Sequence, residues 1–504
     1  MVILDGNSLT LNEFIQVVRF NAKVALSEES IERIKKSEKI ISGIVENETV
    51  IYGVNTGFGK LANVLINKDE VGILQENLLK SHACGVGEYF DNEVTRGIML
   101  LRINALAKGF SGIRYQTLER LIFYLNENIL PLIPEKGSLG ASGDLAPLAH
   151  MALSLIGIGN VRFQGKIVDV TDVLNHYGLK PLKLFAKEGL SLINGTQVMT
   201  SVGAITTYDA IQLAKLADIA GSLTMEALYG IKDAMDERIH EVRGHKGQIN
   251  TAKNILSLTK DSTYITRQGE KRVQDAYALR CIPQVHGACK DAIEYVFSKI
   301  EIEMNAATDN PLVFSDSVIS GGNFHGEPMA IAFDFLKVAL SELANISERR
   351  TERLVNPSLS EGLPAFLVKN SGLNSGFMIM QYTAAALVSE NKVLAHPASV
   401  DSIPSSANQE DHVSMGTIAS RQAREILHNA QNVIAIELLA STQALDLRER
   451  KCLGKGTKIA YNVIREHIPF IDQDIVMSPI IEKMRNLIIN NKILEAVEKE
   501  VKLI

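Results

Sequence analysis

A short run of the chain packs glycine around a single serine. Residues 137–148 read GSLGASGDLAPL, with Ser142 between an alanine and the last of three glycines. Glycine permits backbone conformations closed to other residues and lets main-chain atoms approach closely. If this backbone bends tightly, the amide nitrogen of Gly143 can attack the carbonyl carbon of Ala141 and close a five-membered ring. Loss of two waters, one carrying the Ser142 hydroxyl, then leaves an exocyclic methylidene, which is a strong electrophile.

For an isolated Ala-Ser-Gly tripeptide, a flexible loop is by far the commoner interpretation. The longer string GSLGASGDLAPLAH, residues 137–150, resembles the signature of the aromatic amino acid lyases. The similarity runs over essentially the whole chain and is greatest to the histidine-type members of that family. It implies a prosthetic group, 4-methylideneimidazol-5-one (MIO), formed autocatalytically from Ala141, Ser142 and Gly143.

An electrophilic group of this kind is needed to eliminate ammonia from an amino acid. The amine of an amino acid is a poor leaving group and its β-proton is very weakly acidic, so elimination needs both ends activated. A covalent electrophile that captures the amine splits one hard step into easier ones. Pyridoxal phosphate could supply the electrophile, but no segment strongly suggests a site for it. The resemblance implies a carbon–nitrogen lyase that converts L-histidine to trans-urocanate and ammonia, the first step of histidine degradation.

A second candidate loop, residues 51–59, reads IYGVNTGFG and carries Tyr52. On the sequence alone, a tyrosine in such a loop is more often a packing or capping group. The resemblance implies instead that Tyr52 is the general base for the β-proton. A free phenol titrates near ~10, so Tyr52 needs positive potential nearby to work as phenolate near neutrality.

Three polar residues recur at steps of three in segment 273–280. Gln274, Tyr277 and Arg280 share one side of this segment if it is helical. The ordinary interpretation is a solvated helical face. The resemblance implies that Arg280 binds the substrate carboxylate, which a guanidinium fits well, and that Gln274 and Tyr277 orient the substrate and the prosthetic ring. Ala276, where the family commonly has proline, is a departure without expected consequence.

Two further loop residues are candidates. Asn194, in the string INGTQ, could be the N-cap of a helix. In the lyases the matching asparagine hydrogen-bonds the prosthetic group, and both roles are compatible. Phe324, in the string GGNFH, matches an aromatic residue that lines the pocket beside the prosthetic ring.

Substrate identity depends on two positions. The string ANQEDHVSM, residues 407–415, resembles the histidine-type enzymes and implies that Glu410 faces an imidazole, although by itself Glu410 would be an ordinary surface acid. A carboxylate complements imidazole N–H groups and is unfavourable against an apolar ring. A lone histidine is usually a packed or surface residue, but His82 matches the position at which the family recognises the substrate ring. Tyr89 stands where histidine-type enzymes usually carry proline.

Apolar residues at helical spacing dominate long segments of the chain, at 196–228, 328–354, 375–394 and 414–447. Strand signals are sparse, with one hairpin expected over 161–168. These patterns predict an all-α protein with a central bundle of long helices. The resemblance implies the aromatic ammonia-lyase fold, which is fumarase/aspartase-like. It also implies one lyase domain over 1–504, with an active-site loop region at about 1–190 and the bundle and C-terminal helices at about 191–504.

Composition excludes several classes of protein. The net charge of -6, without a basic run, argues against nucleic-acid or anionic-membrane partners, and no stretch reaches the ~18 apolar residues of a membrane span. No secretory signal is evident, so we expect a cytoplasmic enzyme. The four cysteines form no CxxC pair, so we expect free thiols and no metal site. The expected partners are an amino acid substrate and, by resemblance, copies of the chain in a homotetramer whose active sites are each assembled from loops of three subunits.

Three alternatives remain. A tyrosine or phenylalanine ammonia-lyase, or an MIO-dependent 2,3-aminomutase, predicts an apolar or phenol-binding pocket, which is difficult to reconcile with Glu410. A fumarase- or aspartase-type lyase needs a serine-rich loop of the SSxMPxKxN kind, which the sequence lacks. A helical binding protein with a dead lyase site would have lost Tyr52, Ser142 or Arg280, and all three are present.

Overall fold

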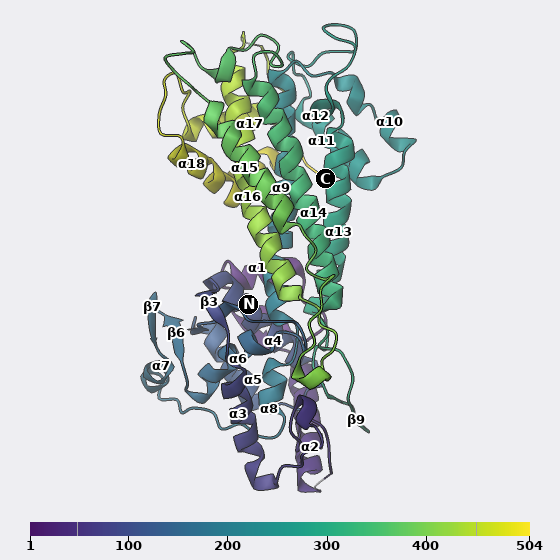
Figure 1. Cartoon of the computed structure of the whole chain (residues 1–504), viewed down its shortest axis with the longest axis vertical. Helices are drawn as coiled ribbons and strands as arrows, with labels where there is room; N and C mark the ends of the chain where they lie inside the picture. Colours follow the sequence, from purple (N-terminus) through teal and green to yellow (C-terminus); the bar gives the residue numbers. More distant parts are fainter. Residues whose placement is uncertain (48, 450) are drawn as a thin grey trace. The chain divides into compact units, whose positions relative to one another are not determined.

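Helices make up most of the computed structural model of this chain, which describes residues 1–47, 49–449 and 451–504 (Figure 1). The four long predicted helices are confirmed, and one further long helix joins them. These five are α9 (Gln197–Ala227), α13 (Ile282–Met304), α14 (Glu327–Val355), α15 (Met378–Leu394) and α16 (Gly416–Asp446). The prediction of an all-α protein is therefore confirmed.

The described residues form two compact units that interleave along the sequence. Unit 1 comprises Met1–Ile205, Phe297–Asp334 and Pro397–Arg421, and unit 2 comprises Thr206–Val296, Phe335–His396 and Gln422–Ile504. Helices α9, α13, α14 and α16 each contribute residues to both units. The single lyase domain over 1–504, with its division near residue 190, stays a prediction.

Unit 1 contains the N-terminal helices and all strands of the described residues. Its helices are α1 (Leu11–Val18), α2 (Glu28–Glu46), α3 (Val71–His82), α4 (Asn92–Ala107), α5 (Tyr115–Asn126), α6 (Leu145–Leu153), α7 (Val170–His176) and α8 (Glu188–Ile193). Its strands are β1 (Val2–Leu4), β2 (Val24–Leu26), β3 (Val86–Tyr89), β4 (Leu130–Pro131), β5 (Pro134–Lys136), β6 (Asn160–Phe163), β7 (Lys166–Asp169), β8 (Leu312–Val313) and β9 (Val318–Ile319). The predicted hairpin is confirmed, because β6 and β7 pair antiparallel.

Helix α4 forms the core of unit 1. Every residue from Val94 to Ala107 is buried, and α1 and α5 pack against the helix. The Asp91 side chain accepts a hydrogen bond from the Val94 amide at 2.9 Å and so caps the helix. A helix buried on all faces belongs to the interior of a large protein. Any charged side chain on α4 therefore needs partners inside the protein.

Within unit 2, a buried polar network joins the four helices α9, α13, α14 and α16, which Figure 1 shows running alongside one another there. Glu437 on α16 binds Arg350 on α14 at 2.5 Å and accepts a hydrogen bond from Thr224 on α9 at 2.7 Å. His286 on α13 lies 3.2 Å from Arg350 and 2.8 Å from Asp218 on α9. Since buried charges are costly without partners, this network restricts how the helices pack.

The remaining helices of unit 2 are shorter. They are α10 (Glu237–Glu241), α11 (Lys246–Leu258), α12 (Tyr277–Arg280), α17 (Lys455–His467), α18 (Ser478–Ile489) and α19 (Lys492–Glu498). In the described part of the chain, no helix is both long and apolar enough to cross a membrane. All four cysteines are free, as predicted.

The predicted helical face through Gln274, Tyr277 and Arg280 is wrong in part. Helix α12 is a single turn that begins after Ala276, whose φ of -64° and ψ of 158° are extended. The buried Asp275 carboxylate accepts hydrogen bonds from the Ile231 amide and from the nearby Arg272 side chain, and these hold the preceding residues out of helical geometry. Gln274 therefore lies outside the helix that carries the other two residues.

Candidate active site

The tripeptide Ala141–Gly143 forms a bend between β5 and α6 in unit 1. Gly143 has a φ of +73° and pairs with Gly195 in an isolated parallel bridge. A Cβ at position 143 would lie 2.2 Å from the Gly195 carbonyl oxygen. The left-handed φ and the close backbone contact together require glycine here.

Gly143→Ala is expected to destabilise the protein far more than a change in φ preference alone explains. Gly165, in the β6–β7 turn, is a matched control, because its φ is +75° and no atom lies within 4 Å of where its Cβ would be. Gly165→Ala should cost about 1 to 2 kcal/mol from the left-handed backbone. Gly143→Ala should cost about 1 to 3 kcal/mol more, because its Cβ meets backbone. Thermal unfolding of both variants measures this difference, and equal midpoints would contradict it.

Asp144 fixes the end of the bend. Its buried carboxylate accepts hydrogen bonds from the backbone amides of Val198 and Met199, both at 2.9 Å. It also accepts hydrogen bonds from the Ser138 and Thr417 hydroxyls. Burial raises the pKa of Asp144, and these hydrogen bonds oppose the shift. The carboxylate satisfies amides in the first turn of α9 that have no partner within the helix.

Asn194 lies next to the bend but is not the N-cap that the sequence suggested. It is the C-cap of α8, with its backbone N–H donating to the Leu190 carbonyl, and α9 begins only at Gln197. The side chain is buried, and its Oδ1 has no hydrogen-bond partner among the described residues. A buried acceptor without a donor is unfavourable. Asn194 therefore presents a free acceptor at the wall of the cavity described next.

A cavity of about 360 Å³ opens over the bend. Five of the predicted site residues line it, which are Tyr52, Ser142, Asn194, Phe324 and Glu410. The remaining lining residues are Gly59, Ala62, Asn310, Ser320, Gly321 and Gln409. The structure thus gathers side chains from five separate loops around Ser142.

Glu410 is held by hydrogen bonds to both of its carboxylate oxygens. Ser142 Oγ donates to Oε1 at 2.9 Å, and Ser405 Oγ donates to Oε2 at 3.1 Å. The backbones of residues 405 and 410 also pair in both directions. Between them, Ser406, Ala407 and Asn408 all have positive φ, a costly conformation that persists only where the surrounding structure enforces it. Ser405 was not among the predicted site residues.

Tyr52 is half-buried, and its hydroxyl accepts a hydrogen bond from the Gly59 amide at 3.3 Å. Burial raises the pKa of this phenol and the charge of Glu410 raises it further, although the Gly59 hydrogen bond opposes the shift. The described residues that line the cavity include no lysine or arginine. Within one chain, burial and the charge of Glu410 therefore favour the neutral form of the phenol.

His82 ends α3 and does not line the cavity, but it lies within the electrostatic influence of Glu410. Burial lowers the pKa of His82, and the charge of Glu410 opposes this. Its Nδ1 lies 3.0 Å from Ser81 Oγ. Tyr89, the departure noted in the sequence, is exposed in β3, where it pairs with Pro134 of β5.

The sequence of the chain matches one known protein family over most of its length. The sequence model of the family 'Aromatic amino acid lyase' matches residues 9–466 of the chain. The chain belongs to the aromatic amino acid lyase family. The resemblance noted in the sequence is confirmed, and this lyase is an enzyme of the carbon–nitrogen lyase class.

Individual relatives match this lyase over nearly its whole length. A histidine ammonia-lyase of Alkaliphilus oremlandii is 60% identical over 504 residues, which cover 100% of this chain and 99% of the relative. The structure of histidine ammonia-lyase from Trypanosoma cruzi is 43% identical with a TM-score of 0.92, covering 99% of this chain and 95% of that one. Tyrosine aminomutase from Streptomyces globisporus is 40% identical with a TM-score of 0.96, covering 100% and 99%. The predicted aromatic ammonia-lyase fold is confirmed.

Three predicted site residues of this lyase belong to unit 2 and are not among those lining the cavity. Gln274 and Tyr277 are exposed, and the Tyr277 ring is 70% exposed. The Arg280 guanidinium lies 4.6 Å from the centre of that ring, and its Nε is buried without a described partner. A large exposed aromatic ring stacked against an arginine is a surface suited to contact another molecule.

A buried arginine of this lyase, Arg102 on α4, holds the backbone beside the bend. Its Nη1 donates to the Asn194 carbonyl at 2.9 Å, to Gln197 Oε1 at 2.9 Å and to the Thr308 carbonyl at 3.1 Å. Nε and Nη2 have no partner among the described residues, and burial lowers the pKa of Arg102 to about 10. Arg102 was not predicted, although an arginine inside a helix buried on every face is a signal that could have found it.

Arg102→Met is expected to lower the free energy of unfolding by about 2 to 4 kcal/mol. Three buried acceptors would lose their donor, and relief from burying the guanidinium offsets only part of that loss. Arg238→Met is the control, because the Arg238 side chain is 86% exposed and should change the free energy by less than about 0.5 kcal/mol. Urea denaturation of the two variants gives the comparison, and similar midpoints would show that Arg102 does not support this region.

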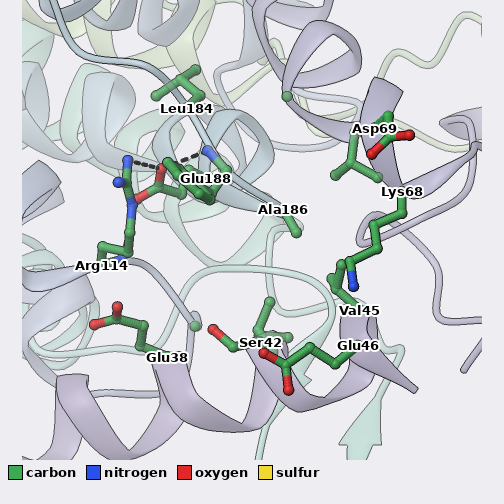
Figure 2. Close-up of a pocket in the computed structure, with 15 residues that line it drawn as sticks. Glu38, Ser42, Val45, Glu46, Lys68, Asp69, Arg114, Leu184, Ala186 and Glu188 are labelled. Carbon is green, nitrogen blue, oxygen red and sulfur yellow. Dashed lines mark hydrogen bonds and ion pairs between the residues drawn. The ribbon is translucent and has the colours of Figure 1, made fainter. Parts of the chain in front are cut away.

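A second cavity in unit 1, of about 450 Å³, contains none of the predicted site residues. Figure 2 shows Arg114 and Glu188 on one wall, with Lys68 and Asp69 across from them. The Glu188 carboxylate is already satisfied, chiefly by Arg114 at 2.6 Å. Glu46 is the last residue of α2, and Lys68 and Asp69 begin the short helical turn Lys68–Glu70, so this cavity lies beside both ends of the segment that carries Tyr52.

Proposed function

We propose that this lyase eliminates ammonia from L-histidine to give trans-urocanate. The observation that carries the proposal is the Glu410 carboxylate in the cavity, hydrogen-bonded to Ser142. An imidazole offers N–H groups to such a carboxylate, whereas an apolar ring would leave the charge unpartnered. The 60% identical relative named histidine ammonia-lyase supports the same substrate.

We infer that Ala141, Ser142 and Gly143 form the prosthetic group MIO. The residues present fit it in three respects. Position 143 has no space for a Cβ, the Ser142 hydroxyl lies at the cavity, and the Asn194 side chain at the cavity wall carries amide N–H groups that could donate to the ring carbonyl oxygen. When formed, the group supplies an electrophilic carbon that makes the substrate amine a better leaving group.

The side chains of this chain then bind the substrate and move its protons. Glu410 accepts a hydrogen bond from the imidazole and so orients the ring, with His82 nearby. Phe324 covers one wall of the cavity and excludes water. Tyr52 removes the β-proton, for which it must first become phenolate.

We propose that the working unit is a homotetramer with shared active sites. The described residues that line the cavity include no cationic side chain, and Tyr52 needs one nearby because burial and the charge of Glu410 raise its pKa. Arg280, with Tyr277 and Gln274, supplies that cation and a clamp for the substrate carboxylate from a neighbouring copy. The four free cysteines fit a reducing compartment, which supports a cytoplasmic location.

The test is an assay of purified protein with single amino acids. L-Histidine should yield urocanate and ammonia, while L-tyrosine and L-phenylalanine should remain unchanged. Consumption of L-tyrosine in preference to L-histidine would contradict the proposal.

The second candidate is a tyrosine 2,3-aminomutase. The 40% identity and TM-score of 0.96 to tyrosine aminomutase favour it as an alternative. An aminomutase returns the amine to the β-carbon, so it yields a β-amino acid where an ammonia-lyase releases ammonia. Chromatography of the product with L-tyrosine therefore separates the two functions.

A further inference from the structure

The Ser142 hydroxyl is hydrogen-bonded to the Glu410 carboxylate in the chain as translated, before any ring has formed. The two oxygens, Ser142 Oγ and Glu410 Oε1, are 2.9 Å apart. This is the hydroxyl that ring formation must expel as water. An acid in direct contact with a departing hydroxyl is in position to protonate it.

We propose that Glu410 is the proton donor that releases the Ser142 hydroxyl while the prosthetic group forms, before it serves in substrate binding. The proposal rests on the proposed function, since it requires that the ring forms. On this proposal, Glu410 Oε1 first donates a proton to Ser142 Oγ and later accepts a hydrogen bond from the substrate imidazole. Glu410 is a catalytic residue of the maturation step, because it contacts the reacting group.

The Gly143 nitrogen attacks the Ala141 carbonyl carbon, and the carbonyl oxygen takes up the amide protons of Gly143 and Ser142 and leaves as the first water. A double bond between the Ala141 carbon and the Ser142 nitrogen remains in the ring. The Ser142 Cα proton then passes to solvent, and its electron pair forms the Cα–Cβ double bond. The Cβ–Oγ bond breaks, and Oγ takes the proton of the Glu410 carboxyl to leave as the second water. Glu410 remains as carboxylate and regains a proton from solvent.

Among the described residues that line the cavity, Glu410 is the only carboxyl group. The Tyr52 hydroxyl accepts a hydrogen bond from the Gly59 amide at 3.3 Å, and among the described residues the hydrogen bond of Ser142 Oγ goes to Glu410 and not to Tyr52. Amides such as Asn194 are too weakly acidic to donate a proton. Ser405 donates to Glu410 Oε2 at 3.1 Å, which fixes the carboxyl and leaves Oε1 toward Ser142. The same oxygen pair carries the hydrogen bond in the opposite direction once the carboxyl is protonated.

Loss of the hydroxyl has a consequence for binding. Oε1 loses its donor when Ser142 is dehydrated, and a partly buried acceptor needs a replacement. An imidazole N–H of the substrate provides one. Maturation thus frees the acceptor on which substrate binding depends.

The experiment follows conversion of the chain by mass, without substrate. Wild type, Glu410→Gln and the neighbouring exposed control Asp411→Asn are produced in parallel and sampled over time. Wild type and Asp411→Asn should reach a mass two waters below the translated chain, with the loss mapped to residues 141–143. Glu410→Gln keeps the shape but has no acidic proton, so its conversion should be at least about 100-fold slower.

Conversion of Glu410→Gln at the wild-type rate would overturn the proposal while leaving the proposed function intact. A wild-type chain at its full translated mass would instead overturn the proposed function. Glu410→Asp retains an acidic proton further from Ser142 and should convert at an intermediate rate. If circular dichroism shows that the Gln variant is unfolded, the Asp variant decides: slower conversion than wild type supports the proposal, and equal conversion overturns it.

Discussion

Ser142→Ala is expected to lower turnover of L-histidine by on the order of 10⁴-fold or more, equivalent to at least about 5.5 kcal/mol of activation free energy. Alanine has no hydroxyl to expel, so no methylidene can form from residues 141–143. The amine would then have to leave without an electrophile to activate it. Urocanate formation followed by ultraviolet absorbance measures the loss.

Ser138→Ala is the matched control for this variant. Ser138 lies in the same loop and donates to Asp144 at 2.8 Å, but it does not line the cavity. Its replacement should lower stability modestly and leave turnover within about tenfold of wild type, about 1.4 kcal/mol. Full activity of Ser142→Ala would remove the chemical basis of the proposed function.

Tyr52→Phe is expected to lower kcat by about 10² to 10⁴-fold, the usual contribution of a general base. The ring of phenylalanine fills the same space but cannot accept the β-proton. The mass of residues 141–143 should be the same as in wild type, because the role proposed for Tyr52 is removal of a substrate proton and not ring formation. Tyr89→Phe, in the exposed strand β3, is the control and should retain wild-type kcat.

The role proposed for Tyr52 also predicts how the activity of the wild-type enzyme depends on pH. Burial and the charge of Glu410 raise the pKa of Tyr52, so the neutral phenol predominates below that pKa. Only the phenolate accepts the β-proton, so kcat/KM should rise with pH up to the phenol pKa. The residual activity of Tyr52→Phe should lack this rise. An identical pH profile for both proteins would exclude Tyr52 as the base.

The long helices could be predicted from sequence because their apolar spacing persists over many turns. Segments 196–228 and 414–447 match α9 and α16 to within a few residues. Short elements depend on contacts that sequence spacing does not contain. Gln274 lies outside α12 because the buried Asp275 carboxylate accepts a hydrogen bond from the Ile231 amide, which is distant in sequence.

The candidate site was predictable where a motif was present, and not where a role arises from folding. Tyr52, Ser142 and Glu410 lie in separate loops, and the structure places all three at one cavity. Ser405 and Arg102 carry no motif. Their roles come from hydrogen bonds to Glu410 and to the Asn194 backbone, which exist only once the loops and α4 have packed.

The N-cap suggested for Asn194 illustrates the same limit. Asparagine is common at both ends of helices, so residue type alone does not tell which helix it caps. The end of α8 at Ile193 decides the matter. The place of Asn194 on the cavity wall is the feature that connects it to chemistry, and that place is not readable from one residue.

The most direct measurement is the intact mass of the purified wild-type chain, followed by sequencing of the peptide that spans residues 141–143. Self-condensation of that tripeptide predicts a deficit of two waters confined to those three residues. A chain that weighs what its translated sequence weighs would contradict the account.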